Sequence, residues 1–214
     1  MLVACGRFGF DPDDGAALDA PSGTVVATFG ETPGATYSGV TSDTWIASEA
    51  PQNNYGASAT MTTEGSQSLV LLRFDLTAIS PGKIVVAARL HVDLSYVESS
   101  CSIAVAPILE QWIEGNGDGT SGVANWTQRT TTQLWSTAGA GSPGSADAAI
   151  ASFQTSTNGP LGVDLPVATI QRWIDAPTTN FGFELSGSGG AECRFESSGS
   201  TPANRPELVI TYYP

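Results

Sequence analysis

The chain has 214 residues, of which 41% are hydrophobic and 14% are charged, so it can bury a full core within one large β domain. Its formal net charge is -13, with eight Lys and Arg against 21 Asp and Glu. This balance argues against a nucleic-acid partner, because binding a phosphate backbone needs clustered basic residues. It also disfavours an acidic glycan as ligand and favours neutral sugars or a protein surface.

Residues 1–40 are expected to be an N-terminal segment outside the folded domain. Leu2-Val3-Ala4-Cys5 resembles a bacterial lipobox, in which Cys5 takes a lipid anchor, although the apolar run that normally precedes the motif is missing. Either the natural start lies upstream or the match is accidental. The remainder is rich in Gly, Pro, Ala and Asp, which predicts a flexible acidic tether. The alternative is a first strand at residues 25–29, which would move the domain boundary towards the N-terminus.

From residue 41 onward the pattern is that of strands. A first strand is expected around Asp43-Thr44-Trp45-Ile46, and residues 69–76 begin as an apolar run and end in alternation. Residues 88–94 alternate between apolar and polar side chains throughout, which predicts an antiparallel strand with one wet face. Further strands are expected at residues 102–111, 182–186, 191–196 and 207–212. One short helix is predicted over residues 166–175, with Pro166 at its start. The fold class is therefore all-β, an antiparallel β-sandwich.

Several cassettes follow one another in a familiar order: Asp43-Thr44-Trp45-Ile46, Pro51-Gln52-Asn53-Asn54-Tyr55-Gly56, residues 69–76, residues 88–94 and residues 205–213. In order and spacing they resemble the DNRLRE domain family, which is related to carbohydrate-binding module family 96, and the resemblance covers residues 41–214. It implies an extracellular β-jelly-roll without catalytic activity, binding a polysaccharide or cell-surface glycan. The alternative function is a structural or adhesive cell-surface domain with protein contacts. Together with the lipobox, this predicts a lipid-anchored protein at the extracellular or outer-membrane surface, with membrane contact only through Cys5.

Two cysteines remain once Cys5 is set aside. In an exported chain Cys101 and Cys193 can form a disulfide, and the alternative is two buried free thiols. Their spacing carries no metal-site signal, and His91 is the single histidine, expected on the wet face of a strand.

No catalytic residues are assigned. His91 is the only candidate base for a nucleophilic triad, and a Gly-x-Ser-x-Gly motif occurs only in broken form near Gly187. Carboxylates are numerous enough to pair by chance, so they do not indicate a glycosidase.

The central stretch from Trp112 to Gly139 is long and polar, as functional loops often are, and resembles the corresponding stretch of the family. We expect Trp126, Arg129 and Trp135 to bind ligand, because indoles stack on sugar rings and Arg bonds to hydroxyls. Whether Trp126 and Trp135 are exposed or buried stays open. Trp45, Trp112 and Trp173 are expected in the core.

The same stretch suggests a structural Ca²⁺. Glu114, Asn116 and Asp118 recur at every second residue, as in the first half of a calcium loop, although the full EF-hand pattern is not met. The alternative is a simple flexible turn. Residues 53–56 are interpreted as a tight turn, with Gly56 supplying left-handed geometry.

Overall fold

The computed structural model describes residues 23–39 and 41–214. The lipobox and the lipidation site at Cys5 lie outside these residues. The strands are β1 (Val25–Gly30), β2 (Thr41–Ala47), β3 (Asn53–Asn54), β4 (Thr60–Glu64), β5 (Ser68–Phe74), β6 (Ile84–Val97), β7 (Cys101–Pro107), β8 (Thr120–Ser121), β9 (Ala151–Thr155), β10 (Gly159–Asp164), β11 (Phe183–Gly187), β12 (Glu192–Glu196) and β13 (Glu207–Tyr213). One α-helix, α1 (Val167–Asp175), lies between β10 and β11. In the described residues no helix is long and apolar enough to cross a membrane.

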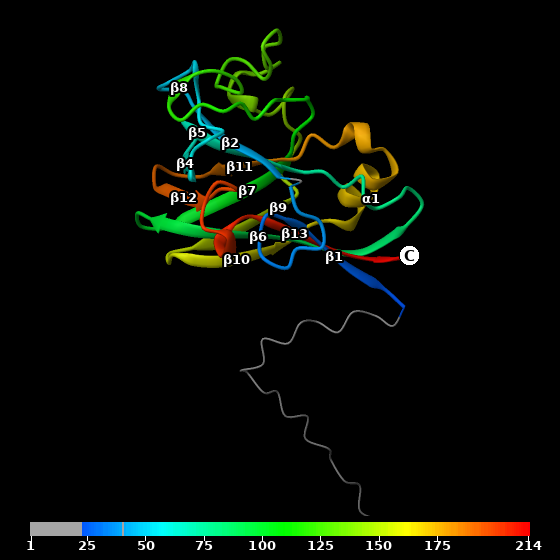
Figure 1. The fold of residues 1–214 in the computed structure, drawn as a ribbon. Coiled ribbons are helices and arrows are strands. Elements are labelled where there is room, and N and C mark those ends of the chain that lie inside the picture. The colour runs from blue at the N-terminus through cyan, green and yellow to red at the C-terminus, as the bar shows by residue number, and fades with distance from the viewer. Residues whose placement is uncertain (1–22, 40) are drawn as a thin grey trace, which may run out of the picture.

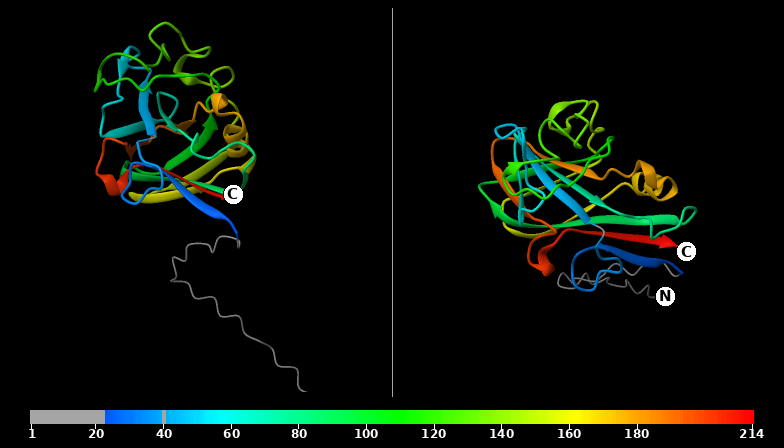
Figure 2. Two further views of the ribbon diagram at one scale, coloured as in Figure 1. Left: turned by 45° about the vertical axis from the view of Figure 1, so that its right-hand side comes forward. Right: turned by 45° about the horizontal axis from the view of Figure 1, so that its top comes forward.

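Eleven of the strands form one antiparallel sheet that curls into two facing layers, and β3 and β8 form a separate two-stranded sheet (Figures 1 and 2). One layer has the order β2-β5-β11-β7-β9. The other is built on β6, with β10 along one edge and β13 and β12 along the opposite edge. β1 lies beside β13, and β4 lies beside β12. The predicted all-β sandwich with one short helix is confirmed.

β5 and β6 show how the sequence pattern sets these layers. In β6, alternate residues from Ala88 to Leu94 are buried, while Arg89, His91 and Asp93 face away, as predicted. β5 is buried on both faces: Val70 and Leu72 face the other layer, and Leu69 and Leu71 face outward under a loop. A run of consecutive apolar residues is what a strand covered on both sides requires.

Two hydrophobic cores result. The inner core fills the space between the layers, and its largest buried side chains are Phe29, Met61, Phe74, Trp173, Phe183 and Phe195. The outer core lies on the other face of the β2-β5-β11-β7 layer and comprises Ile46, Leu69, Leu71, Ile108, Trp112, Ala124, Trp135 and Ala140. Trp112 and Trp173 are core residues, as predicted. Trp45 is only half-buried against the inner core and stacks on Tyr55 with ring centroids 3.8 Å apart.

The two layers are also joined covalently. Cys101 at the start of β7 and Cys193 in β12 form a disulfide with a Cα–Cα distance of 6.0 Å, and both are buried. This confirms the predicted pairing and excludes the alternative of two free thiols. A disulfide indicates that the protein folds in a non-reducing, extracellular-type environment.

Two predicted boundaries are corrected. β1 pairs residue by residue with β13 and places Phe29 in the inner core, so among the described residues the sheet begins at Val25 and not near residue 41. The alternative of a first strand before residue 40 is thus confirmed. β7 ends at Pro107, and the predicted strand does not continue to Gln111, because the chain leaves the sheet there and crosses its outer face.

Candidate functional site

Residues 108–146, which we call the covering segment, lie over the outer face of the β2-β5-β11-β7 layer (Figure 1). Apart from the short pairing of β8 with β3, the segment has little regular structure. Its buried side chains complete the outer core, so apolar contact holds it to the sheet. What fixes its shape is a small set of polar anchors.

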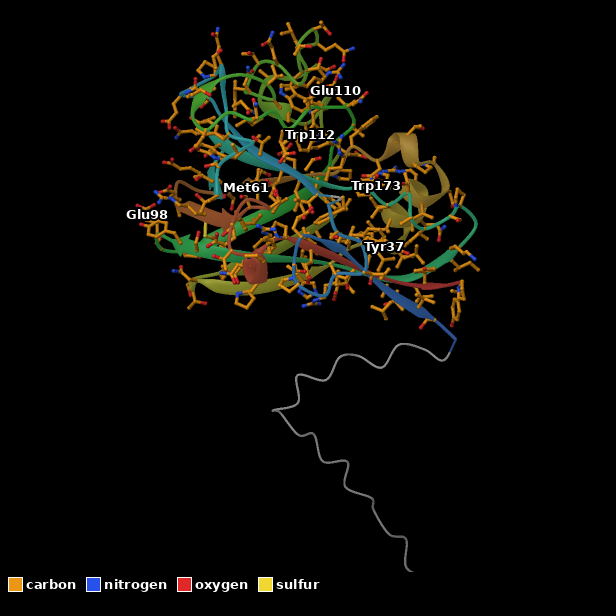
Figure 3. All side chains as sticks on the ribbon, viewed as in Figure 1. Tyr37, Met61, Glu98, Glu110, Trp112 and Trp173 are labelled. Atoms are coloured by element: carbon orange, nitrogen blue, oxygen red, sulfur yellow. A yellow bond between two sulfur atoms is a disulfide. The ribbon has the colours of Figure 1, made fainter. Side chains whose placement is uncertain are left out.

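Trp112 is the largest fully buried side chain of the covering segment (Figure 3). Its indole Nε1–H donates to the carbonyl of Phe181 at 2.7 Å. The guanidinium of Arg73, on β5, lies over the ring with Cζ 5.1 Å from the centroid. The hydrogen bond satisfies the buried indole N–H, and the guanidinium adds electrostatic attraction to the face of the ring.

Asn54, in β3, fixes the backbone of the first part of the covering segment by hydrogen bonds. Its side chain is fully buried, and Nδ2 donates to the carbonyls of Glu114 at 2.7 Å and Ala124 at 2.9 Å. Its Oδ1 accepts from the backbone N–H of Gly117 at 2.7 Å. One amide side chain thus satisfies three backbone groups of the loop, which would be costly to bury unpaired.

The expected tight turn at residues 53–56 lies two residues further on. Asn53 and Asn54 form β3, and the turn spans Tyr55 to Ser58, where the backbone N–H of Ser58 donates to the carbonyl of Tyr55 at 3.1 Å. Gly56 lies in this turn but does not adopt the left-handed backbone conformation. Gly56 is needed for a different reason: a Cβ there would lie 2.4 Å from the carbonyl oxygen of Glu114. The cassette packs the covering segment against the domain.

Glu110 is the second polar anchor (Figure 3). Its carboxylate accepts from the backbone N–H and hydroxyl of Ser136 and from the hydroxyl of Ser145. Arg129 pairs with it, with Nε 3.4 Å from Oε1. Burial acts to raise the pKa of Glu110, but these hydrogen bonds and the charge of Arg129 together lower it. The carboxylate therefore stays charged and joins Arg129, Ser136 and Ser145 of the covering segment.

A groove of about 420 Å³ opens in the covering segment next to β3 and β8. It is lined by residues with amide, hydroxyl or apolar side chains and by one glycine: Gln52, Ser121, Gly122, Val123, Asn125, Thr127, Gln128, Thr131 and Leu134. None of these described residues is charged. An isolated antiparallel bridge between Gln128 and Leu134 sets two of them side by side, and Leu134 is 65% exposed.

Asn125 fixes the floor of this groove. Its Nδ2 donates to the carbonyl of Gly122 at 2.6 Å. Its Oδ1 accepts from the backbone N–H groups of Thr127 at 2.9 Å and Gln128 at 2.7 Å. The amide of Asn125 is thus used within the protein, whereas no hydrogen bond within the described residues engages the side chain of Gln128. The groove has a rigid floor and free polar groups at its rim, which suits binding of hydroxyl-rich molecules.

The structure separates the three predicted ligand-binding residues. Trp135 is 5% exposed, and its Nε1–H donates to the carbonyl of Asn125 at 2.9 Å, so it is a core residue and not a stacking surface. Trp126 is half-buried against the outer core, with its ring against Gly139. Of the two indoles, Trp126 keeps part of its surface accessible.

Arg129 is used within the covering segment. Beyond its ion pair with Glu110, Nε donates to the carbonyl of Leu134 at 3.1 Å and Nη1 to that of Gln111 at 2.8 Å. These bonds tie the backbone of Gln111 to Leu134 at the rim of the groove. Arg129 therefore positions groove residues, and direct contact with a ligand stays a prediction.

The three residues expected to bind Ca²⁺ point to different surroundings. Asn116 and Asp118 are exposed, whereas Glu114 is half-buried and its Oε1 accepts from the backbone N–H of Asp43 at 3.2 Å. Burial raises the pKa of Glu114 to about 7, and the charge of Asp43 adds to this. Within residues 23–39 and 41–214 no three acidic, His or Cys side chains gather as a metal site. Ca²⁺ takes six to eight oxygen ligands, of which these side chains supply at most a few, so Ca²⁺ binding at this loop stays a prediction.

A search against profiles of known protein families finds no match for this sequence, and a search of curated proteins finds no relative.

Sequence reasoning missed the groove residues Gln52, Gln128 and Leu134. They are uncharged, non-aromatic and not periodic, so neither residue type nor spacing marks them. The available signal was their position beside the Gly-rich loop and the Asn53–Asn54 cassette, which the structure brings together through β3 and β8.

Proposed function

We propose that this protein is a non-catalytic, extracellular carbohydrate-binding module that takes neutral glycan chains in the groove of the covering segment. The observation that carries the proposal is the lining of that groove. Amides and hydroxyls surround an exposed Leu134, and none of the described residues that line the groove is charged. Sugar hydroxyls pair with such groups, and the apolar face of a pyranose ring packs on an aliphatic or aromatic side chain. The resemblance to the DNRLRE family supports the same proposal.

A structural or adhesive role is the second candidate. Leu109, Ile113 and Leu134 are exposed by 45%, 45% and 65%, all on the covering segment. Exposed apolar side chains on one element are typical of a protein-contact surface. This role predicts binding to a protein partner that survives changes to the polar rim of the groove.

Calorimetric titration with soluble neutral polysaccharides tests the first candidate. We expect Gln128→Ala and Leu134→Ala each to weaken binding about tenfold, the loss of one hydrogen bond or one apolar contact, while Tm stays unchanged. Gln133→Ala is the matched control, because Gln133 is an exposed amide of the same segment that does not line the groove. Equal affinity in all three variants, or no binding by the parent, would retire the groove as a glycan site.

Display on a membrane through Cys5 is part of the same proposal and rests on the lipobox-like residues 2–5. A diacylated cysteine would anchor the chain stably, since each buried CH₂ contributes about 0.8 kcal/mol. Mass spectrometry of the protein from its native host is expected to show a lipidated Cys5, and an unmodified thiol there would contradict it.

A further inference from the structure

The groove next to β3 and β8 is lined by three carboxamide side chains, those of Gln52, Asn125 and Gln128. Asn125 uses its amide to hold the floor. Gln52 is exposed and Gln128 is half-buried, and no hydrogen bond within the described residues engages either of these two side chains. Each of them therefore offers a ligand both N–H donors and a carbonyl acceptor.

An aliphatic side chain lies beside one of the free amides. Gln128 and Leu134 face each other in an isolated antiparallel bridge, and Leu134 is 65% exposed. Residues opposite each other in an antiparallel pair direct their side chains to the same face, with Cβ atoms about 5 Å apart. The groove thus presents a carboxamide and a branched apolar group side by side.

The acetamido group is the substituent of neutral sugars that matches this pair. Its N–H can donate to the oxygen of a carboxamide, its carbonyl can accept from the carboxamide N–H, and its methyl group can pack on an aliphatic side chain. A hydroxyl at the same position has a single oxygen, so it cannot make two linear hydrogen bonds to both ends of one carboxamide. It also lacks the methyl group.

The rest of the groove suits a sugar ring better than a peptide. Ser121 and Thr131 are exposed, and no hydrogen bond within the described part of the chain engages their hydroxyls. Ring hydroxyls can pair with them, whereas a peptide backbone carries no hydroxyl. The described lining residues are uncharged, which disfavours a deacetylated sugar, because its ammonium would lose water without gaining a counter-ion.

We propose that the groove selects glycans that carry N-acetyl groups, with one acetamido group held between Gln128 and Leu134. The inference rests on the proposed glycan-binding function and names its substrate class, a neutral polysaccharide of acetamido sugars. Gln128 makes the paired hydrogen bonds and determines the specificity, and Leu134 covers the methyl group.

Calorimetric titration of the full chain with two tetrasaccharides tests the proposal. Tetra-N-acetylchitotetraose and cellotetraose have the same β-linked backbone and differ in carrying an acetamido group or a hydroxyl on each ring. We expect the acetylated ligand to bind at least about tenfold more tightly, because it makes one additional hydrogen bond. This comparison uses the parent chain, so it does not depend on the folding of any variant.

Gln128→Ala should reduce that preference about tenfold. The variant loses two hydrogen bonds to the acetylated ligand, about a hundredfold in affinity, but one to cellotetraose, about tenfold. Gln133→Ala should bind both ligands as the parent does, because Gln133 is an exposed amide of the covering segment that does not line the groove. An unchanged ratio of the two affinities in Gln128→Ala would overturn the assignment.

The methyl contact is measured separately by saturation-transfer NMR with tetra-N-acetylchitotetraose. Saturation of the protein methyl protons should pass more strongly to the acetyl methyl groups than to the ring protons. Leu134→Ala should lower this difference, because it removes the side chain that covers the methyl group. Uniform transfer over the whole sugar in the parent would contradict the proposed placement.

The remaining outcomes separate this inference from the proposed function. Equal affinity for the two tetrasaccharides would overturn the acetamido preference and leave the groove as a glycan site, whereas no binding of either would retire both. N-acetyl-trialanine amide serves as a third probe, because it presents secondary amides and methyl groups without sugar hydroxyls. If it binds as tightly as the acetylated tetrasaccharide, the groove recognises peptides and the proposal is overturned.

Discussion

The inner and outer cores are built from the same β5 strand but are stabilised in different ways. The inner core is filled by side chains that alternate along long paired strands, with Phe74, Phe183 and Phe195 among the largest. The outer core is closed by an irregular segment, and buried Asn54 and Asn125 fix that segment through its backbone. Apolar contact thus defines the sandwich, whereas polar anchors define the surface that carries the groove.

The largest effect is expected in the inner core. Phe183 is fully buried, and its ring centroid lies 4.8 Å from that of Trp173 on α1. Phe183→Ala should lower the free energy of unfolding by about 3 to 5 kcal/mol, because the surrounding strands cannot collapse into the cavity. Urea denaturation followed by tryptophan fluorescence measures this. A loss below about 1 kcal/mol would show that the inner core is not tightly packed.

Removing the disulfide is expected to have a slightly smaller effect. The double variant Cys101→Ala, Cys193→Ala frees a bond that closes a long loop and joins the two layers, which should cost about 2 to 4 kcal/mol. The groove lies on the other side of the sheet, so its ligand affinity should not change. Two thiols in the denatured, unreduced parent beyond any at Cys5 would contradict the bond itself.

The outer core is tested through Asn54. Asn54→Ala leaves the buried N–H of Gly117 without an acceptor, which should cost about 2 to 3 kcal/mol. The matched control is Asn53→Ala, whose side chain makes one exposed bond to the carbonyl of Gly119 and should cost less than about 1 kcal/mol. Hydrogen exchange should show faster opening at residues 115–124 in the first variant, with the strands protected. Uniform loss of protection would mean that the two cores unfold as one unit.

The smallest effect concerns Glu184, a buried carboxyl on β11 that faces the outer core between Leu71 and Ala106. Burial raises its pKa to about 7 from an ordinary 4.5, against a hydrogen bond from Ser186. Since the folded state binds the proton more tightly, this contribution to stability is full below pH 4.5 and is lost as the pH rises through 7.

Glu184→Gln keeps the neutral shape, so it should stabilise the protein by about 2 kcal/mol at pH 6 and change little at pH 4.5. Thermal melts of parent and variant across this range measure the difference. Asp43 and Glu114 also have raised pKa values and remain in both proteins, so only the difference reports on Glu184. A parallel pair of pH profiles would contradict the assignment.

The sequence predicted the sandwich where the chain alternates strongly, as in β6, and where an apolar run marks double burial, as in β5. It missed β4, β9 and β10, because Thr60–Glu64, Ala151–Thr155 and Gly159–Asp164 are short and rich in small and polar residues, so the alternation in the last two covers too few apolar residues to stand out. Those strands form because the backbone N–H and carbonyl groups of neighbouring strands are in place to hydrogen-bond with theirs.

The candidate site was harder to predict for a different reason. Nothing local distinguishes Trp126 from Trp135, and the difference arises because Trp135 finds a buried acceptor in the carbonyl of Asn125 once the segment has closed. The burial of a loop residue depends on partners that only the folded chain brings within reach.

The pairing of β1 with β13 has a mechanical consequence. Val25 lies opposite Tyr212, so the chain enters and leaves the sandwich at the same place, on the side away from the covering segment (Figures 1 and 2). Attachment at either end therefore leaves the groove unobstructed and facing outward. When the groove is pulled against an attachment at Val25, the load crosses from one layer to the other, which the Cys101–Cys193 bond and the β12–β4–β5 pairing join. Tension between the two ends opens the β1–β13 pairs one at a time from the margin and leaves the face that carries the groove intact.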